Sequence, residues 1–207
     1  MVENPMLRVC IDRYEASIWD SPSAGSGMHY GKLSDDFPSG FPDLVDSVDC
    51  SGQCLGEDTE TPTLTLYALS VADVLPSRQV TWFQAKRACE NSGKRLCTAA
   101  EWGEACSRTG MRVYPYGDTY DADRCNSAST DAVVTGSYDM CEGGYDKLFD
   151  MFGNLKEWTS TCDTSCNVYG GHYAASMDQF GCTERSSRHA PADDLAIIGF
   201  RCCSAVN

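Results

Sequence analysis

The feature that most constrains how this chain can fold is its cysteine content, because thirteen cysteines occur in 207 residues. A reduced cytosolic protein carries so many thiols only when they bind metals. The three histidines, His29, His172 and His189, do not have zinc-finger spacing. The sequence therefore predicts disulfides and a secreted, periplasmic or cell-surface protein. Because the count is odd, one thiol is left free or is bonded to a partner.

Two pairs of cysteines are separated by only three residues, Cys50 with Cys54 and Cys162 with Cys166. Each pair could close a short disulfide loop, or the four thiols together could bind one zinc ion. The disulfide interpretation is favoured because the other nine cysteines also require an oxidising compartment.

Composition excludes several classes of partner. A formal net charge of -14 repels phosphates, which argues against a nucleic-acid ligand and against an anionic membrane face. No run of eighteen apolar residues is present, so no membrane insertion is expected. The first residues lack the basic start and apolar centre of a signal peptide, so an exported form is expected to have lost its leader. The length and the 42% hydrophobic content suit a single domain over residues 1–207.

Alternation of apolar and polar residues predicts one strand over Val9–Ser17 and another over Thr63–Leu69. The intervening stretch, Ile18–Pro62, is rich in Ser, Gly, Pro and Asp and is interpreted as a long loop or insert.

Two helices are predicted from capping boxes, in which a threonine is followed three residues later by Gln or Glu. Thr81 begins a helix of about 82–92 that stops at Gly93, and Thr98 begins one of about 99–109 that stops at Gly110. Each places a cysteine on its core-facing stripe. After Gly110 only short irregular strands are expected, which gives an α+β domain with a large loop fraction.

The stretch Tyr145–Trp158 combines apolar anchors with oxygen donors. The carboxylates of Asp150 and Glu157 and the backbone carbonyls of Gly153 and Leu155 have spacings at which they can converge on one hard cation, and this donor set suits calcium. The alternative is an ordinary loop with a glycine turn and solvated acids.

A series of motifs then carries a resemblance to a known family. They are GKRL at 93–96, TAAEW at 98–102, YPYG at 114–117, DMFGNLKEWT at 150–159, Gly-Gly at 170–171 and GFRC at 199–202. In order and spacing they resemble the formylglycine-generating enzyme, or sulfatase-modifying factor, family over roughly Val80–Cys203. The resemblance implies a C-type-lectin-like fold. It also implies a structural calcium ion on the same four residues named above, and disulfides Cys89–Cys202 and Cys106–Cys182.

The resemblance fails at the catalytic residues. Family enzymes that make formylglycine use two reactive cysteines just after the Gly-Gly strand to bind copper(I), but here residues 170–182 contain only Cys182. Neither Ser176 nor Asp178 supplies the soft thiolate that copper(I) requires. Three scattered histidines do not provide the iron site of the related sulfoxide-forming branch. We therefore expect no oxidase activity of either kind.

The sequence instead predicts a ligand-binding face on the loops before the last strand, with a protein or a glycan as the ligand. Individually these residues could equally be core or solvated. The predicted ligand-binding residues are Tyr173, Met177, Asp178, Gln179, Phe180, Arg185, Arg188 and His189.

Two alternatives remain open. The chain could be a variable binding protein of a diversity-generating retroelement, a class that shares this fold. It could also be an enzyme, either a copper-dependent oxidase acting on a peptide cysteine or one with its chemistry elsewhere. Candidates for such chemistry are a spare thiol (Cys10, Cys97 or Cys203) and the acids Asp193 and Asp194.

Overall fold

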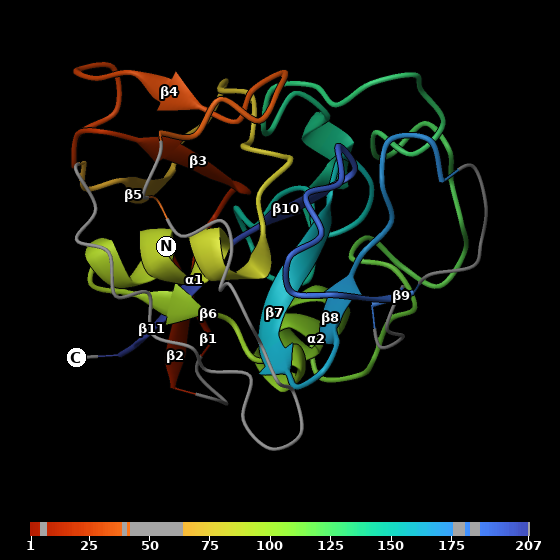
Figure 1. Cartoon of the computed structure of the whole chain (residues 1–207). Helices are drawn as coiled ribbons and strands as arrows, with labels where there is room; N and C mark the ends of the chain where they lie inside the picture. Colours follow the sequence, from red (N-terminus) through yellow and green to blue (C-terminus); the bar gives the residue numbers. More distant parts are fainter. Residues whose placement is uncertain (5–7, 39–40, 42–63, 176–180, 183–186, 207) are drawn as a thin grey trace.

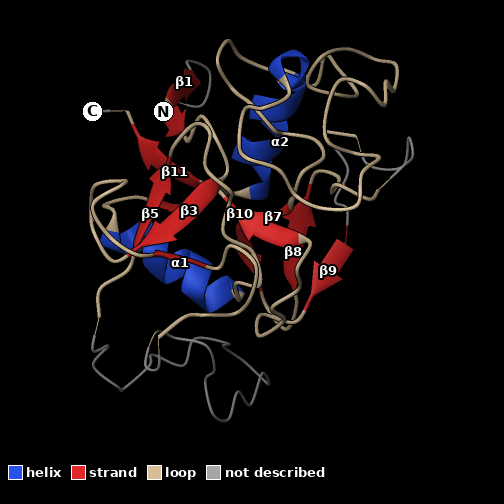
Figure 2. Ribbon diagram, turned by 90° about the horizontal axis from the view of Figure 1, so that it is seen from above, coloured by secondary structure: helices blue, strands red, loops and turns tan. Residues whose placement is uncertain are grey.

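The computed structural model describes residues 1–4, 8–38, 41, 64–175, 181–182 and 187–206. Three small sheets, two α-helices and a short 3-10 helix (Asp139–Cys141) make up the described part, with long loops between them (Figures 1 and 2). This is the predicted α+β architecture.

The first sheet joins the two ends of the chain. It has the order β1 (Val2–Asn4), β2 (Val9–Ile11), β11 (Cys202–Ala205), β6 (Arg95–Leu96), with antiparallel neighbours throughout. The second sheet has the order β10 (Ile198–Phe200), β7 (Lys156–Cys162), β8 (Cys166–Tyr169), β9 (Ser187–His189), and only its β10–β7 pair is parallel. The third consists of β4 (His29–Tyr30), β3 (Ala16–Trp19) and β5 (Tyr67–Ser70).

The predicted strand Val9–Ser17 is wrong as one element, because the chain forms β2 and β3 in different sheets. The residues between them bend the chain so that two acids point into the protein. Asp12 is 0% exposed and accepts hydrogen bonds from Lys94 Nζ at 2.8 and 2.9 Å, and Glu15 is 1% exposed. Alternation along the sequence does not reveal this turn, since Asp12 and Glu15 read as solvent-facing positions.

The predicted long loop Ile18–Pro62 contains regular structure in its first half. The strand β3 extends to Trp19, β4 lies within the segment, and Phe41 is 2% exposed in the core. The predicted strand Thr63–Leu69 is observed as β5, one residue longer at its end and starting at Tyr67. The pair Cys50 and Cys54 lies outside the described residues.

Both predicted helices are present with complete capping boxes. Helix α1 (Trp82–Asn91) follows the N-cap Thr81, and α2 (Ala99–Ser107) follows the N-cap Thr98. The chain leaves α1 through Gly93, whose φ of +67° is the left-handed conformation that glycine adopts without strain. Helix α2 ends earlier than predicted because Arg108 and Thr109 already have φ of 51° and 68° before Gly110.

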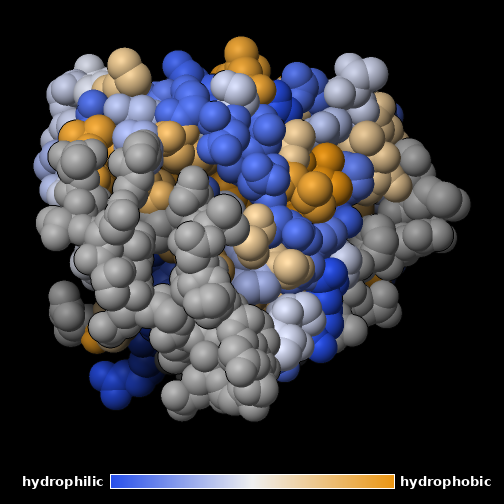
Figure 3. Space-filling view, in the orientation of Figure 1, coloured by the Kyte–Doolittle hydropathy of each residue, from blue (hydrophilic) through white to orange (hydrophobic). Residues whose placement is uncertain are grey.

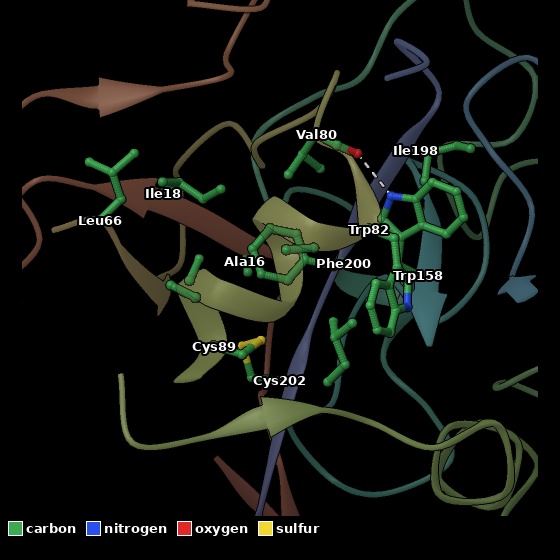
Figure 4. Packing of buried hydrophobic residues seen from close by; sticks show 14 of the residues in the cluster. Ala16, Ile18, Leu66, Val80, Trp82, Cys89, Trp158, Ile198, Phe200 and Cys202 are labelled. Carbon is green, nitrogen blue, oxygen red and sulfur yellow. Dashed lines mark hydrogen bonds between the residues drawn. A yellow bond between two sulfur atoms is a disulfide. The ribbon is translucent and has the colours of Figure 1, made fainter. Parts of the chain in front are cut away.

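The largest hydrophobic core lies between α1 and the sheets. Trp82 and Cys89 of α1 pack with Trp158, Ile198 and Phe200, as Figure 4 shows, and Ala85 belongs to the same cluster. The indole Nε1 of Trp158 donates to the carbonyl of Val80 at 2.9 Å, so the buried ring keeps its hydrogen bond. A second cluster joins α2 to the turn before β7 through Trp102, Leu148 and Met151. The exposed apolar side chains are scattered, and the face in Figure 3 is mostly hydrophilic.

Five disulfides link the described cysteines. Three are pairs that the sequence predicts, Cys89–Cys202, Cys106–Cys182 and Cys162–Cys166. Two are additional, Cys97–Cys203 and Cys125–Cys141. The suggestion that Cys97 or Cys203 is a spare thiol is therefore wrong, and Cys10 is the free cysteine among the residues described.

Candidate functional site

A cluster of buried charges holds the turn before β7. The guanidinium of Arg201 and the carboxylate of Glu157 are both 0% exposed, and Nη2 of Arg201 lies 2.7 Å from Oε1 of Glu157. Nε of Arg201 and the indole Nε1 of Trp102 donate to Oε2 of Glu157 at 2.7 and 2.6 Å. Arg201 also donates to the carbonyl of Phe149 at 3.0 Å. The last strands are thereby tied to the turn and to α2.

Two further buried carboxylates leave this cluster with excess negative charge. Glu15 accepts from the backbone N–H of Leu155 at 2.9 Å, and Asp150 accepts from the backbone N–H of Gly136 at 2.8 Å. Burial, followed by the charges of Asp150 and Glu157, raises the pKa of Glu15 well above its usual range. Burial also raises the pKa of Asp150 to about 6. Three carboxyl groups thus share one guanidinium, an arrangement that favours either a bound proton or a cation.

Asp150, Gly153 and Leu155, three of the four residues predicted to hold calcium, lie in this turn, and the fourth, Glu157, follows in β7. Among the described residues no three His, Cys, Asp or Glu side chains are grouped to hold a metal. Two of the four expected calcium donors are backbone carbonyls, which are not side-chain ligands. The excess carboxylate charge beside Asp150 fits a cation. Glu157 is already engaged by Arg201 and Trp102, so a calcium ion in the turn would have to share its oxygens with them.

Asn154 connects this turn to the predicted ligand-binding face. Its side chain donates to Oε2 of Glu15 at 2.5 Å and accepts from Nδ2 of Asn126 at 2.9 Å. Its backbone carbonyl accepts from the N–H of Tyr173 at 2.9 Å, and the carbonyl of Tyr173 accepts from the N–H of Ser129 at 2.7 Å. The backbone of Tyr173, the first predicted ligand residue, is therefore held from two sides, by the buried Asn154 and by the half-buried Ser129.

Strand β9 presents its two predicted ligand residues differently. Arg188 is exposed and donates to Oδ1 of Asp163 at 2.6 Å and to the carbonyl of Ser165 at 2.8 Å. The half-buried ring of His189 stands edge-on to Trp158, with centroids 6.0 Å apart. The remaining predicted residues, Met177–Phe180 and Arg185, lie outside the described residues.

His189 is the centre of a short hydrogen-bonded chain. Its Nε2 lies 2.8 Å from Oγ of Ser187, and its Nδ1 lies 3.4 Å from Oδ2 of Asp193. The order hydroxyl, imidazole, carboxylate is that of hydrolase triads. Here all three groups come from one edge strand and the turn after it, an arrangement that also arises from local side-chain packing. We interpret these three hydrogen-bonded side chains as a network that orients the imidazole of His189.

Two residues near His189 were missed by the sequence analysis. Burial lowers the pKa values of Lys156, His172 and His189, and the charge of Lys156 lowers both histidine pKa values further. Lys156 is only 8% exposed at the start of β7, and because lysine is usually an exposed residue, its type alone does not indicate a buried position. Only the pairing of β7, β8 and β9 brings these basic groups together.

Comparisons with known proteins place this geometry in context. A family model described as the sulfatase-modifying factor enzyme 1-like domain matches residues 41–206. "Inactive C-alpha-formylglycine-generating enzyme 2" of Bos taurus is 29% identical over 164 residues, which is 62% of this chain and 50% of that protein. "Serine/threonine-protein kinase pkn1" of Chlamydia pneumoniae is 31% identical over 150 residues, 62% of this chain and 24% of that protein. The chain thus spans half or less of these relatives.

Solved structures show the same fold at low identity. PvdO from Pseudomonas aeruginosa superposes with a TM-score of 0.58 at 16% identity, covering 94% of this chain and 79% of that one. Treponema denticola variable protein 1 superposes with a TM-score of 0.53 at 15% identity, covering 63% of this chain and 71% of that one. No helix of the described residues is long and apolar enough to cross a membrane.

Proposed function

The chain belongs to the sulfatase-modifying factor enzyme 1-like domain family, and from this membership we propose that it is a non-catalytic binding module of the secreted, periplasmic or cell-surface compartment. Disulfides and a structural calcium ion stabilise the scaffold. The loops from Tyr173 to Phe180 and from Thr183 to Ile197 bind a protein or glycan ligand.

One observation carries the non-catalytic part of the proposal. Cys182 is the single cysteine between residues 167 and 201, and its sulfur is bonded to Cys106. A copper(I) site of the family type requires two thiolates in this segment. The only free thiol among the described residues, Cys10, lies on β2 in the first sheet and not on the second sheet that carries the ligand face. A relative named as inactive is consistent with the same loss.

The binding part rests on how the face is built. The backbone of Tyr173 is anchored by Asn154, and the backbone of His189 pairs with Cys166 in β8 while Ser187 and Asp193 orient its ring, so both side chains stand on backbone that hydrogen bonds hold in place. A fold shared with a protein named as variable supports the alternative that the loops are diversified by a retroelement. A reverse transcriptase gene and a template repeat beside this gene would identify that case.

Binding and oxidation are separated by one experiment with two arms. In the first, copper-loaded protein is incubated with oxygen and a peptide carrying the sulfatase recognition sequence, and we expect no aldehyde by mass spectrometry. In the second, the protein is screened on a glycan array and against a library of secreted proteins. Any hit is retested with the double variant Tyr173→Ala/His189→Ala, which we expect to lose binding at least tenfold, as truncating central contact residues does.

The control for this experiment is Lys86→Ala, a half-exposed position on α1 whose side chain is paired with Glu90. It should bind like the wild type. Aldehyde formation would contradict the non-catalytic assignment, and equal binding by the double variant would contradict the assignment of the face.

The proposed calcium ion leads to a separate prediction, which concerns how Asp150 makes stability depend on pH. A carboxyl whose pKa is raised by folding stabilises the protein fully below its unfolded value of 3.8, and this contribution is lost as the pH rises through about 6. Without calcium, the free energy of unfolding should therefore fall between pH 4 and pH 7 by up to about 3 kcal/mol more in the wild type than in Asp150→Asn. Calcium at millimolar concentration should remove this difference by neutralising the carboxylate.

Urea unfolding at several pH values, in EGTA and in calcium, measures the effect. Asp146→Asn, an exposed acid four residues earlier, is the control and should follow the wild type. A wild-type stability that is the same in EGTA and in calcium at pH 7 would exclude the calcium ion.

A further inference from the structure

A pocket that the sequence analysis did not identify lies in the loop after α2. It has a volume of about 570 Å³, within the range of small-ligand sites. Its lining residues include the aromatic Tyr116 and Tyr120 and the acidic Asp118 and Asp121. We call this the tyrosine pocket.

The pocket rests on a rigid base. The ring of Tyr116 stacks on that of Tyr114 with centroids 5.6 Å apart and an interplanar angle of 8°, and Tyr114 itself is 2% exposed. The hydroxyl of Tyr120 lies 3.1 Å from Oγ of Ser127. The disulfide Cys125–Cys141 pins the end of the loop. The aromatic walls are therefore held in place before any ligand arrives.

The pocket already contains one cationic side chain of the protein itself. The guanidinium carbon of Arg124 lies 5.8 Å from the centroid of the Tyr116 ring, and its Nε lies 3.4 Å from Oδ2 of Asp121. A cation over an aromatic face beside a carboxylate is the arrangement that recognises organic cations. Both partners of this ion pair are about half exposed, with side-chain exposures of 40% and 46%, so the pair is weak and can be displaced.

The tyrosine pocket adjoins the ligand-binding face. The backbone N–H of Val113 donates to Oδ1 of Asp118 at 3.2 Å, and the carbonyl of Val113 accepts from the N–H of Cys182 at 2.7 Å. One residue thus joins the rim of the pocket to the segment that carries the proposed ligand loops. In Figure 1 the loop after α2 and strand β9 lie on the same side of the molecule.

From these contacts we propose that the tyrosine pocket binds an arginine or lysine side chain of the partner protein, in competition with Arg124. This inference rests on the proposed function and specifies the chemistry of its partner as a polypeptide with an exposed basic residue. The net charge of -14 attracts such a partner at long range, and the rings and carboxylates of the pocket hold its cationic group.

The test uses Nα-acetyl-arginine amide as the probe and Nα-acetyl-citrulline amide, its neutral isostere, as the matched ligand control. Binding is followed by chemical-shift changes in ¹H–¹⁵N spectra of the whole chain. We expect the arginine probe to shift resonances of residues 116–124 in a saturable way, with affinity falling as salt is raised, and the citrulline probe to bind about fivefold or more weakly.

Two variants of the pocket should change the affinity for the arginine probe in opposite directions. Tyr120→Ala should weaken the arginine probe about fivefold, whereas Tyr120→Phe keeps the ring and should bind like the wild type. Arg124→Gln should bind the arginine probe about threefold more tightly, because the side chain that competes with the probe is gone.

Equal binding of the two probes, shifts confined to other residues, or weaker binding by Arg124→Gln would each overturn the proposal. The last result would mean that Arg124 supports the walls of the pocket instead of competing with the probe. If Tyr120→Ala does not fold, the citrulline probe and the Arg124→Gln variant still test the proposal. The double variant Tyr173→Ala/His189→Ala leaves the pocket intact and should bind the arginine probe normally, so failure of the pocket is distinguishable from failure of the ligand-binding face.

Discussion

Replacing Arg201 with methionine should lower the free energy of unfolding by about 3–5 kcal/mol, the usual cost of removing one partner from a buried ion pair. The side chain is 0% exposed and its guanidinium lies 2.7 Å from Glu157. Methionine fills most of the volume, so lost packing contributes little. The large term is the carboxylate of Glu157, which is left buried beside Glu15 and Asp150 with no positive charge among them. Urea unfolding of the oxidised protein measures the change.

A double-mutant cycle separates charge from packing. Adding Glu157→Gln to Arg201→Met removes the uncompensated charge, so the double variant should be more stable than Arg201→Met alone. Arg188→Met serves as the control, because its ion pair with Asp163 is exposed and should contribute little to stability. An Arg201→Met variant as stable as Arg188→Met would show that the buried cluster does not depend on the guanidinium.

Removing the disulfides Cys89–Cys202 and Cys97–Cys203 together should have the largest effect of any change we predict. The two bridges lie side by side, since eight residue steps separate Cys89 from Cys97 and one step separates Cys202 from Cys203. Either bridge alone, with the other intact, closes a ring of only about ten residues, so its loss should cost about 3 kcal/mol. With both removed, the remaining bridge Cys106–Cys182 still limits the opened ring to about thirty residues, and the cost should be about 6 kcal/mol.

The effect of removing both bridges should therefore exceed the sum of the single effects by roughly 1 kcal/mol, because only the double removal frees the long ring. Alanine pairs at the two bridges, singly and together, complete the cycle by urea unfolding. The bridge Cys162–Cys166 is the control, because its closing segment is four residues long and its removal should cost about 2 kcal/mol and add independently. Exact additivity of the two neighbouring bridges would contradict the shared-ring explanation.

Local sequence determined the elements whose interactions are themselves local. The capping threonines Thr81 and Thr98 define the starts of both helices, because each cap bonds to an amide three residues away. The loop Cys162–Cys166 is in the same class, since its two sulfurs are four residues apart. The order and spacing of the motifs from Gly93 to Cys202 were enough to identify the family and hence the fold.

Only the tertiary structure decided where the charges and the remaining sulfurs lie. Glu15 and Arg201 are 186 positions apart in the sequence and read as ordinary exposed residues, yet both are buried beside the turn before β7. Cys97 and Cys203 pair because β6 lies next to β11. Ser187, His189 and Asp193 converge through a strand that composition did not predict. A sequence pattern records which side chains can be buried or bonded, but long-range pairing of strands determines which of them meet, since the free energy of a contact depends on partners that are distant along the chain.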